Sequence, residues 1–317
     1  MSKCLTGSVL LFFFVSGSAQ FVPGAFKKTI DSLTRAAPKT FSEIHSVLRE
    51  NKSDTVLMRH FLNVATGRNY VSGRIYALNE LGRTYRNTSQ YTKAVKFHEQ
   101  ALELANNANL LEFKVASLND LGVVYRRVSS IRTAMDYNQQ ALELAETVSN
   151  PSRSLKRSIN VSYNCIGNLY QMLQQYGQAI LYFKKSLKLE TELGNTLGIA
   201  INYQNIGECL EEQGELNQAL ENYRTSLAYN EEIDNDMGRV ICKTSIAQIY
   251  LKQNRPEDAT LFLELLLPLA EKSGDGFLIA PVYINLGWSQ MLSEQYEAAE
   301  TNMLEGLRIA EKYNIRE

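Results

Sequence analysis

The stretch that decides the fold is residues 81–101, LGRTYRNTSQYTKAVKFHEQA, in which Gly82 is followed by alanines at Ala94 and Ala101. The pattern recurs five more times. Small residues stand at positions 82, 122, 167, 207, 247 and 287, so the spacings are 40, 45, 40, 40 and 40 residues. Twelve residues after each of them comes an alanine, at 94, 134, 179, 219, 259 and 299. Self-similarity at such a period is typical of stacked repeats.

Each copy has the pattern of two amphipathic helices joined by a polar turn. Apolar residues recur every three or four positions, as at Ala94, Phe97, Ala101 and Ala105, which is the period of a helix. An earlier copy, residues 61–79, aligns with 101–119 but lacks the small residues further upstream. We therefore predict an all-α solenoid of about seven helix-turn-helix repeats with a degenerate first unit. The predicted boundaries are 35–74, 75–114, 115–159, 160–199, 200–239, 240–279 and 280–317.

The 45-residue spacing and the prolines predict local departures from regularity. One long loop, residues 149–158, is expected to hold the five extra residues. Pro256 and Pro281 are expected at the first position of a helix, where a missing N–H costs nothing. Pro268 is expected to kink or shorten the second helix of the sixth unit.

Composition excludes several classes of protein. The 317 residues include only 6 prolines and 18 glycines, and 44% are hydrophobic, so long helices are favoured over disorder or an all-β fold. The net charge of -1 gives no basic surface for nucleic acid. Three histidines and four cysteines leave little material for a metal site, and we expect no metal and no cofactor.

The first residues have the pattern of a signal peptide. Lys3 precedes a seven-residue apolar run, Val9–Val15, and small residues follow at Gly17 and Ala19, the arrangement of a cleavable leader. Seven apolar residues are too few to span a ~30 Å hydrocarbon core, so no stable membrane span is expected. The prediction is a signal peptide over 1–19 and a linker over 20–34, in a protein that is exported, periplasmic in a bacterium or secreted from a eukaryote. A disordered or misannotated N-terminus is the alternative.

Three cysteines remain after such cleavage, Cys165, Cys209 and Cys242. All three fall within helical patterns, where a buried free cysteine acts as a small hydrophobe. A disulfide between two of them stays open, because it depends on a distance that the sequence does not give.

The repeat resembles the tetratricopeptide repeat family. The resemblance rests on Leu81-Gly82-x-x-Tyr85 followed by Ala94 and Ala101, and on its later copies, and it covers residues 35–317. The period departs from the usual 34 residues and is similar to that of kinesin light chains, spindle-orientation adaptors, bacterial peptide-pheromone receptors and exported Bacteroidetes-type repeat proteins. The resemblance implies a right-handed superhelix whose first helices line a concave groove that binds a protein or an extended peptide.

In that family an asparagine beside the Leu-Gly pair often binds the backbone of the ligand peptide. The resemblance thus implies groove positions for the asparagines near the small residues, Asn79, Asn119, Asn164, Asn205 and Asn285. Helix positions differ by about 100° per residue, so residues two and three positions before the small residue cannot all face the same way. The alternative is that these asparagines bridge neighbouring helices.

The residues just after the small one are expected to form the next groove-facing turn. They run from basic to neutral, acidic and apolar along the chain: Arg83, Arg86 and Arg126; then Asn168; then Glu208 and Glu211; and finally Trp288. Such a gradient would orient an extended peptide, because charge complementarity sets specificity and register. The alternative is that these charges only solvate exposed helix faces.

Catalysis is not expected, because no HExxH motif, phosphate-binding glycine loop or nucleophile elbow occurs. Two functions remain: a non-enzymatic scaffold for a protein or peptide, and the sensory ectodomain of a longer signal-transduction protein, of the histidine kinase or transcription regulator type. The last helix carries Leu304 and Leu307, so self-association through the C-terminal repeat is a further expectation.

Overall fold

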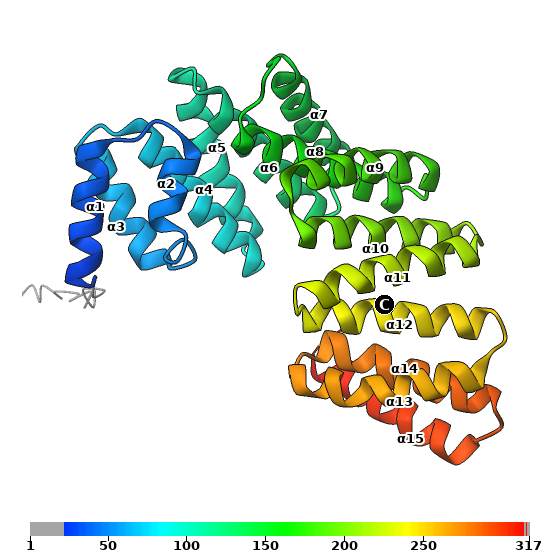
Figure 1. Cartoon of the computed structure of the whole chain (residues 1–317). Helices are drawn as coiled ribbons and strands as arrows, with labels where there is room; N and C mark the ends of the chain where they lie inside the picture. The colour runs from blue at the N-terminus through cyan, green and yellow to red at the C-terminus, as the bar shows by residue number, and fades with distance from the viewer. Residues whose placement is uncertain (1–21, 314, 316–317) are drawn as a thin grey trace, which may run out of the picture.

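The computed structural model describes residues 22–313 and 315. These residues form fifteen α-helices and no strand, which confirms the all-α prediction, and the helices follow one another along a single arch (Figure 1). Each of these helices is too short or too polar to cross a membrane. The helices are α1 Gly24–Ala36, α2 Phe41–Leu48, α3 Thr55–Gly67, α4 Val71–Asn87, α5 Tyr91–Asn107, α6 Leu111–Arg127, α7 Ile131–Glu146, α8 Arg153–Met172, α9 Tyr176–Leu193, α10 Thr196–Glu212, α11 Leu216–Glu232, α12 Asp236–Lys252, α13 Pro256–Ser273, α14 Gly276–Leu292 and α15 Tyr296–Lys312.

Six helix pairs, from α4–α5 to α14–α15, form the regular part of the solenoid. The short helices α2 and α3 stand in the place of the degenerate first unit, so the prediction of about seven units is confirmed. Each helix packs against its sequence neighbours, and the apolar side chains form a series of local clusters along the arch. The core is thus divided among neighbouring helices along the stack, as expected of a solenoid in which each repeat contacts only its neighbours.

The turn between the two helices has the same backbone conformation in each of the six pairs. Seven residues after the small residue, one residue has a φ between 57° and 81°: Ser89, Ser129, Gln174, Gly214, Asn254 and Glu294. The N–H of the following residue then donates to a carbonyl oxygen five residues earlier, as Gln90 does to Tyr85 at 2.8 Å. This is a left-handed cap that satisfies the last carbonyls of the first helix.

The small residues make room for a bulky side chain on the partner helix. Gly82, Gly122, Gly167, Gly207 and Gly287 each face the side chain sixteen residues later, which is His98, Asn138, Phe183, Tyr223 or Met303. A Cβ at any of the five glycines would lie only 2.1 to 2.6 Å from that side chain. The alanines twelve residues after the small residues are all buried. The small residues therefore recur in the sequence because each pair of helices crosses too closely for a larger side chain at that position.

The N-terminal segment differs from the prediction. Residues 20–34 are predicted to form a linker, but from Gly24 onward they belong to α1, which packs against α3. Helix α1 buries Phe26, Ile30 and Leu33, whose spacing of four and three residues is that of an amphipathic helix. The signal peptide predicted over 1–19 lies outside the described residues.

The repeat boundaries also shift. The six regular pairs begin at residues 71, 111, 153, 196, 236 and 276, four to seven residues before the predicted boundaries. The periodicity gives the length of the unit but not the residue at which each unit begins, because the small residue lies inside the first helix and not at its start.

The helices near the prolines and the five-residue insertion differ in part from the prediction. The loop predicted over 149–158 is shorter, because α8 already begins at Arg153, and the extra residues lengthen α8 to 20 residues. Pro256 is at the first position of α13 as predicted, but Pro281 lies inside α14. Helix α13 continues through Pro268 to Ser273, so the predicted shortening there is wrong.

The three described cysteines are free and buried. Burial raises the pKa of the Cys165 and Cys242 thiols and raises that of Cys209 to about 12. Buried thiols that stay protonated are unreactive. The interpretation as buried small side chains is therefore correct, and the disulfide alternative is wrong for these three residues.

Candidate functional site

The first helices of the pairs form one side of the solenoid. Helix α4 packs against α2 and α6, α6 packs against α8, and α12 packs against α10 and α14, whereas successive second helices pack less closely in the described residues. In a curved stack, helices on the inner side lie closer to their equivalents in the next unit than helices on the outer side do. The first helices therefore provide the concave surface.

An acidic pocket lies on this surface in the C-terminal half. It has a volume of about 560 Å³ and is lined from α8, α9, α10, α11, α12 and α14. Three predicted residues, Glu208, Glu211 and Trp288, meet in it. Glu208 and Glu211 lie one helical turn apart on α10, and Trp288 occupies on α14 the register position of Glu208, so stacking of the repeats brings the three to one place.

Hydrogen bonds hold the carboxylates of this acidic pocket in position. The Tyr223 hydroxyl donates to Glu211 Oε2 at 2.6 Å, and Lys252 Nζ lies 2.8 Å from Glu211 Oε1. Burial, together with the Glu211 carboxylate, raises the pKa of Tyr223, so its hydroxyl remains a donor.

The other lining groups leave the acidic pocket negatively charged. Gln171 donates to Glu208 Oε2 at 3.1 Å, and Tyr176 donates to Glu212 Oε2 at 3.4 Å. Its charged residues are three glutamates and one lysine, which gives a formal charge of -2. The Trp288 side chain, 44% exposed, completes the wall.

At the predicted basic end of the groove, Arg83 and Arg86 are paired in a buried ion-pair network, which corrects the charge gradient. Arg83 Nε donates to both carboxylate oxygens of Asp120 at 3.0 Å, and Arg83 Nη1 donates to Glu80 at 2.6 Å. Arg86 Nη1 lies 3.7 Å from Asp120 Oδ1. The two carboxylates balance the two guanidinium groups, so charge at this end cannot be judged from the arginines alone.

His98 closes the network from α5. Its Nδ1 lies 3.0 Å from Asn79 Oδ1. Burial lowers the pKa of His98 to about 4, although Asp120 opposes this shift. The imidazole is therefore neutral at pH 7, and its approach to Asp120 is not an ion pair.

Several predicted asparagines lie inside the packing rather than on the surface. Asn79 and Asn119 are buried and bridge helices, Asn79 to Ser117 at 3.0 Å and Asn119 to the Ser158 carbonyl at 2.7 Å. Asn285 is also buried. For Asn79 and Asn119 the bridging alternative is the correct one.

The remaining predicted residues are half-buried on the concave side. Arg126, Asn164 and Asn168 line another cavity, of about 260 Å³. Asn168 donates to the Asn164 carbonyl at 2.7 Å. Asn205 is half-buried on α10 and lines none of the cavities described in this section.

Among the lining residues that sequence reasoning missed are Tyr176, Tyr223 and Lys252 in the acidic pocket, and Arg157 in a second pocket described below. Tyr223 follows its glycine by sixteen residues, and Lys252 occupies the register position of Glu212 in the next unit. A comparison of every register position would have found these two. Arg157 lies near the start of α8, where the sequence predicts a loop.

Within the described residues, no group of three or more His, Cys, Asp or Glu side chains is arranged to hold a metal ion. The pockets instead offer carboxylates, amides, guanidinium groups and aromatic rings. These groups can form hydrogen bonds, ion pairs and stacking contacts with a ligand.

Known structures share this fold at low sequence identity. Aspartyl phosphate phosphatase F from Bacillus subtilis is 14% identical, with a TM-score of 0.61 over 97% of this chain and 96% of that one. A Rap protein complexed with Competence and Sporulation Factor is 16% identical, with a TM-score of 0.54 over 91% of this chain and 98% of that one. A signal transduction ATPase with a tetratricopeptide repeat sensor, from Pyrococcus horikoshii, is 13% identical, with a TM-score of 0.66 over 92% of this chain and 49% of that one.

In sequence, none of the curated proteins matches this chain. A family model does: the tetratricopeptide repeat matches residues 74–147, 158–232 and 199–272. Those segments cover more than half of the chain and the helix pairs from α4–α5 to α12–α13. The chain therefore belongs to the tetratricopeptide repeat family.

Proposed function

We propose that this protein is a non-enzymatic scaffold that binds a peptide or a segment of another protein on the concave surface of its first helices. The observation that carries the proposal is the acidic pocket, where side chains from successive repeats converge on one cavity. Its charge of -2 and its aromatic rings suit a lysine or arginine side chain, because carboxylates pair with such cations and a tryptophan face attracts them.

The structural neighbours support a binding role of this kind. The Rap protein named above was solved with Competence and Sporulation Factor bound. A solenoid of this fold can therefore hold another molecule, although the low identity carries no residue of that site over to this chain.

The acidic pocket can be tested with a small basic probe. Trp288 is the only tryptophan, so its fluorescence should change saturably when acetyl-Lys-Lys-Lys-amide is added. Changing both Glu208 and Glu212 to glutamine is expected to weaken binding about ten-fold, since each charge contributes up to about 1 kcal/mol. Glu211 is left intact because it pairs with Lys252 and Tyr223.

The matched control carries the same change of charge on a second helix, with Glu231 and Glu232 of α11 both changed to glutamine. These two side chains are exposed, so this variant should bind like the wild type. Equal weakening in both variants, or no saturable response in the wild type, would exclude a cation site in the acidic pocket. Circular dichroism of each variant checks the fold.

A sensory ectodomain is the second candidate function. It is favoured by the Pyrococcus horikoshii neighbour, in which a tetratricopeptide repeat sensor is part of a longer signalling protein and only 49% of that chain is covered. Sequencing the gene beyond the codon for Glu317 decides this point. An apolar span of about 20 residues followed by a signalling module would support the sensor, and a stop codon would exclude it.

We also propose export, on the basis of the leader pattern in residues 1–19. Mass spectrometry of the protein from its native source would show a mature N-terminus near Gln20 if the leader is cleaved. An intact Met1 or Ser2 end would contradict export.

Self-association through the C-terminal repeat is a further proposal. Leu304 and Leu307 of α15 are more than half exposed, whereas Ile309 is buried. Sedimentation equilibrium should show a dimer that Leu307→Glu disrupts, because a charge in an apolar interface is costly. A monomer at all concentrations for the wild type would contradict the proposal.

A further inference from the structure

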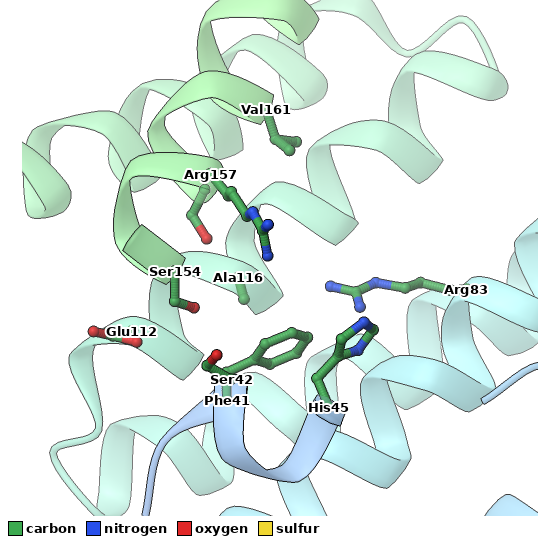
Figure 2. A pocket seen from close by; sticks show the side chains of 10 residues that line it. Phe41, Ser42, His45, Arg83, Glu112, Ala116, Ser154, Arg157 and Val161 are labelled. Atoms are coloured by element: carbon green, nitrogen blue, oxygen red, sulfur yellow. The ribbon is translucent and has the colours of Figure 1, made fainter. Parts of the chain in front are cut away.

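A second pocket lies on the concave surface near the N-terminal end, which we call the arginine pocket. It has a volume of about 250 Å³ and is lined from α2, α4, α6 and α8. Figure 2 shows the guanidinium groups of Arg83 and Arg157 pointing toward one another across it, with Phe41 and His45 on the same side of the cavity. Arg83 is already paired with Asp120 and Glu80, so the unpaired positive charge at this cavity belongs to Arg157. The two guanidinium groups together still offer N–H donors to an anion.

Arg83 is fixed in position by its partners. Asp120 and Glu80 each hold part of its guanidinium group, and the ring of Phe41 lies 5.6 Å from its central carbon. A guanidinium group has five N–H donors in a rigid fork, so these contacts leave further donors available. Because the group is already ordered, little conformational entropy is lost when it binds a ligand.

Arg157 differs from Arg83 because it has no acidic partner. It is exposed near the start of α8, and none of the ion pairs among the described residues includes it. The register positions that correspond to it in the next three units are apolar, Leu197, Met237 and Phe277. The unpaired cation is thus particular to this unit and to this pocket.

The acidic residue in the lining does not neutralise the arginine pocket. Glu112 accepts a hydrogen bond from the Ser152 hydroxyl at 2.5 Å, and Figure 2 shows it at the edge of the cavity, away from the two arginines.

The charged groups that act on His45 are all cationic. Burial lowers the pKa of His45, and Lys52, Arg83, Arg157 and Arg49 lower it further. His45 Nδ1 is engaged with the Tyr76 hydroxyl at 3.1 Å. The imidazole is therefore a neutral group in a positive potential, and it can report the arrival of an anion.

We propose that the arginine pocket is a carboxylate subsite, in which Arg83 and Arg157 bind the side chain of an aspartate or glutamate of the segment held on the concave surface. The inference rests on the proposed function for the segment itself. Phe41, Ala116 and Val161 in the lining suit the methylene groups of such a side chain. With the acidic pocket at the other end, the segment binds in one direction, its acidic residue toward α2 and its basic residue toward α14.

The test uses the three histidines, His45, His60 and His98, as resonances in a proton–carbon NMR spectrum. Acetyl-Glu-Glu-Glu-amide is expected to shift the His45 ring signal saturably and to leave that of the buried His98 in place. The same titration is repeated with acetyl-Gln-Gln-Gln-amide, which lacks the carboxylates, and with inorganic phosphate, which is an anion without a peptide. Raising the ionic strength should weaken the response, because exposed charges are screened by salt.

Arg157→Gln is expected to weaken binding of the acidic peptide about five-fold, the value of an exposed charge pair. The matched control is Arg132→Gln, which removes the same charge from an exposed position on the second helix α7 and should leave binding unchanged. Equal affinity in the Arg157 variant and the wild type would overturn the proposal. A response to phosphate but not to the acidic peptide would also overturn it, since the site would then be one for a free inorganic anion.

The proposals for the two pockets can be refuted independently of each other. The basic probe reports the acidic pocket through Trp288, and the acidic probe reports the arginine pocket through His45. A response to the acidic probe alone would remove the basic-residue part of the proposed function and keep the carboxylate subsite. A response to the basic probe alone would do the reverse.

Discussion

Replacing Asp120 by asparagine is expected to lower the free energy of unfolding by about 3 kcal/mol, the usual consequence of removing one partner of a buried ion pair. Asp120 is only 6% exposed and accepts hydrogen bonds from Arg83 Nε at 3.0 Å. The asparagine keeps the shape but not the charge, so Arg83 would keep only the carboxylate of Glu80 and Arg86 would lose its acidic partner. Urea unfolding followed by circular dichroism measures the difference.

The pH dependence of unfolding separates the contribution of the Asp120 charge to stability from that of its packing. Burial by itself would raise the pKa of Asp120, but the Arg83 guanidinium holds it below its usual value. A carboxyl group with a depressed pKa stabilises the fold above its unfolded pKa of about 3.9 and loses this contribution as the pH falls. The difference between wild type and variant should therefore be constant from pH 7 to about pH 5 and shrink below about pH 4.

The control is Asp258→Asn, which removes the acid of an exposed pair with Arg255 at 2.7 Å. Such a surface pair contributes less than about 1 kcal/mol. A loss of similar size in both variants would show that the Asp120 network has no special stability. A difference between wild type and Asp120→Asn that is as large at pH 3 as at pH 7 would attribute the loss to packing.

Replacing Gly287 by alanine is expected to destabilise the last helix pair by about 2 kcal/mol, as overpacking usually does. Its Cβ would lie 2.6 Å from Met303 Cγ, 2.9 Å from the Ala299 carbonyl oxygen and 3.0 Å from the Met303 nitrogen. Two of these atoms belong to the backbone of α15, so the helix itself must move. The gain of about 1 kcal/mol from replacing a helical glycine by alanine is too small to offset the clash.

Trp288 stands next to Gly287 and reports the result, because a terminal pair of a solenoid can unfold on its own. In Gly287→Ala the tryptophan fluorescence should change at a lower urea concentration than the circular dichroism does. The control is Gly177→Ala in α9, where an added Cβ meets nothing within 4 Å. That variant should be more stable by about 0.5–1 kcal/mol, and a loss of stability there would refute the steric account of the small residues.

The repeat in the sequence is sufficient to predict the solenoid and part of the acidic pocket. Glu208 and Trp288 occupy the same register position two units apart, and Glu211 lies one helical turn beyond Glu208. In a stacked array, equal register positions lie on the same side of successive first helices. Their convergence in one pocket therefore follows from the period alone.

The partners of the other predicted residues depend on side chains from neighbouring helices. Arg83 meets Asp120 from the next unit, 37 residues away, and Asn119 meets the Ser158 carbonyl of the unit after its own, 39 residues away. Nothing in the spacing distinguishes these residues from Arg126 or Asn168, which are only half-buried.

By itself, the sequence of this protein determined the helix type, the length of the repeat and the close crossing at each small residue, because these are properties of a single unit and its nearest turn. Only the tertiary structure decided which charges remain unpaired. Arg83 is matched by Asp120, whereas Arg157 faces the arginine pocket without a partner on a helix that the insertion has lengthened. The reason is physical: an ion pair requires its atoms within a few ångströms, and that distance is set by how the units stack.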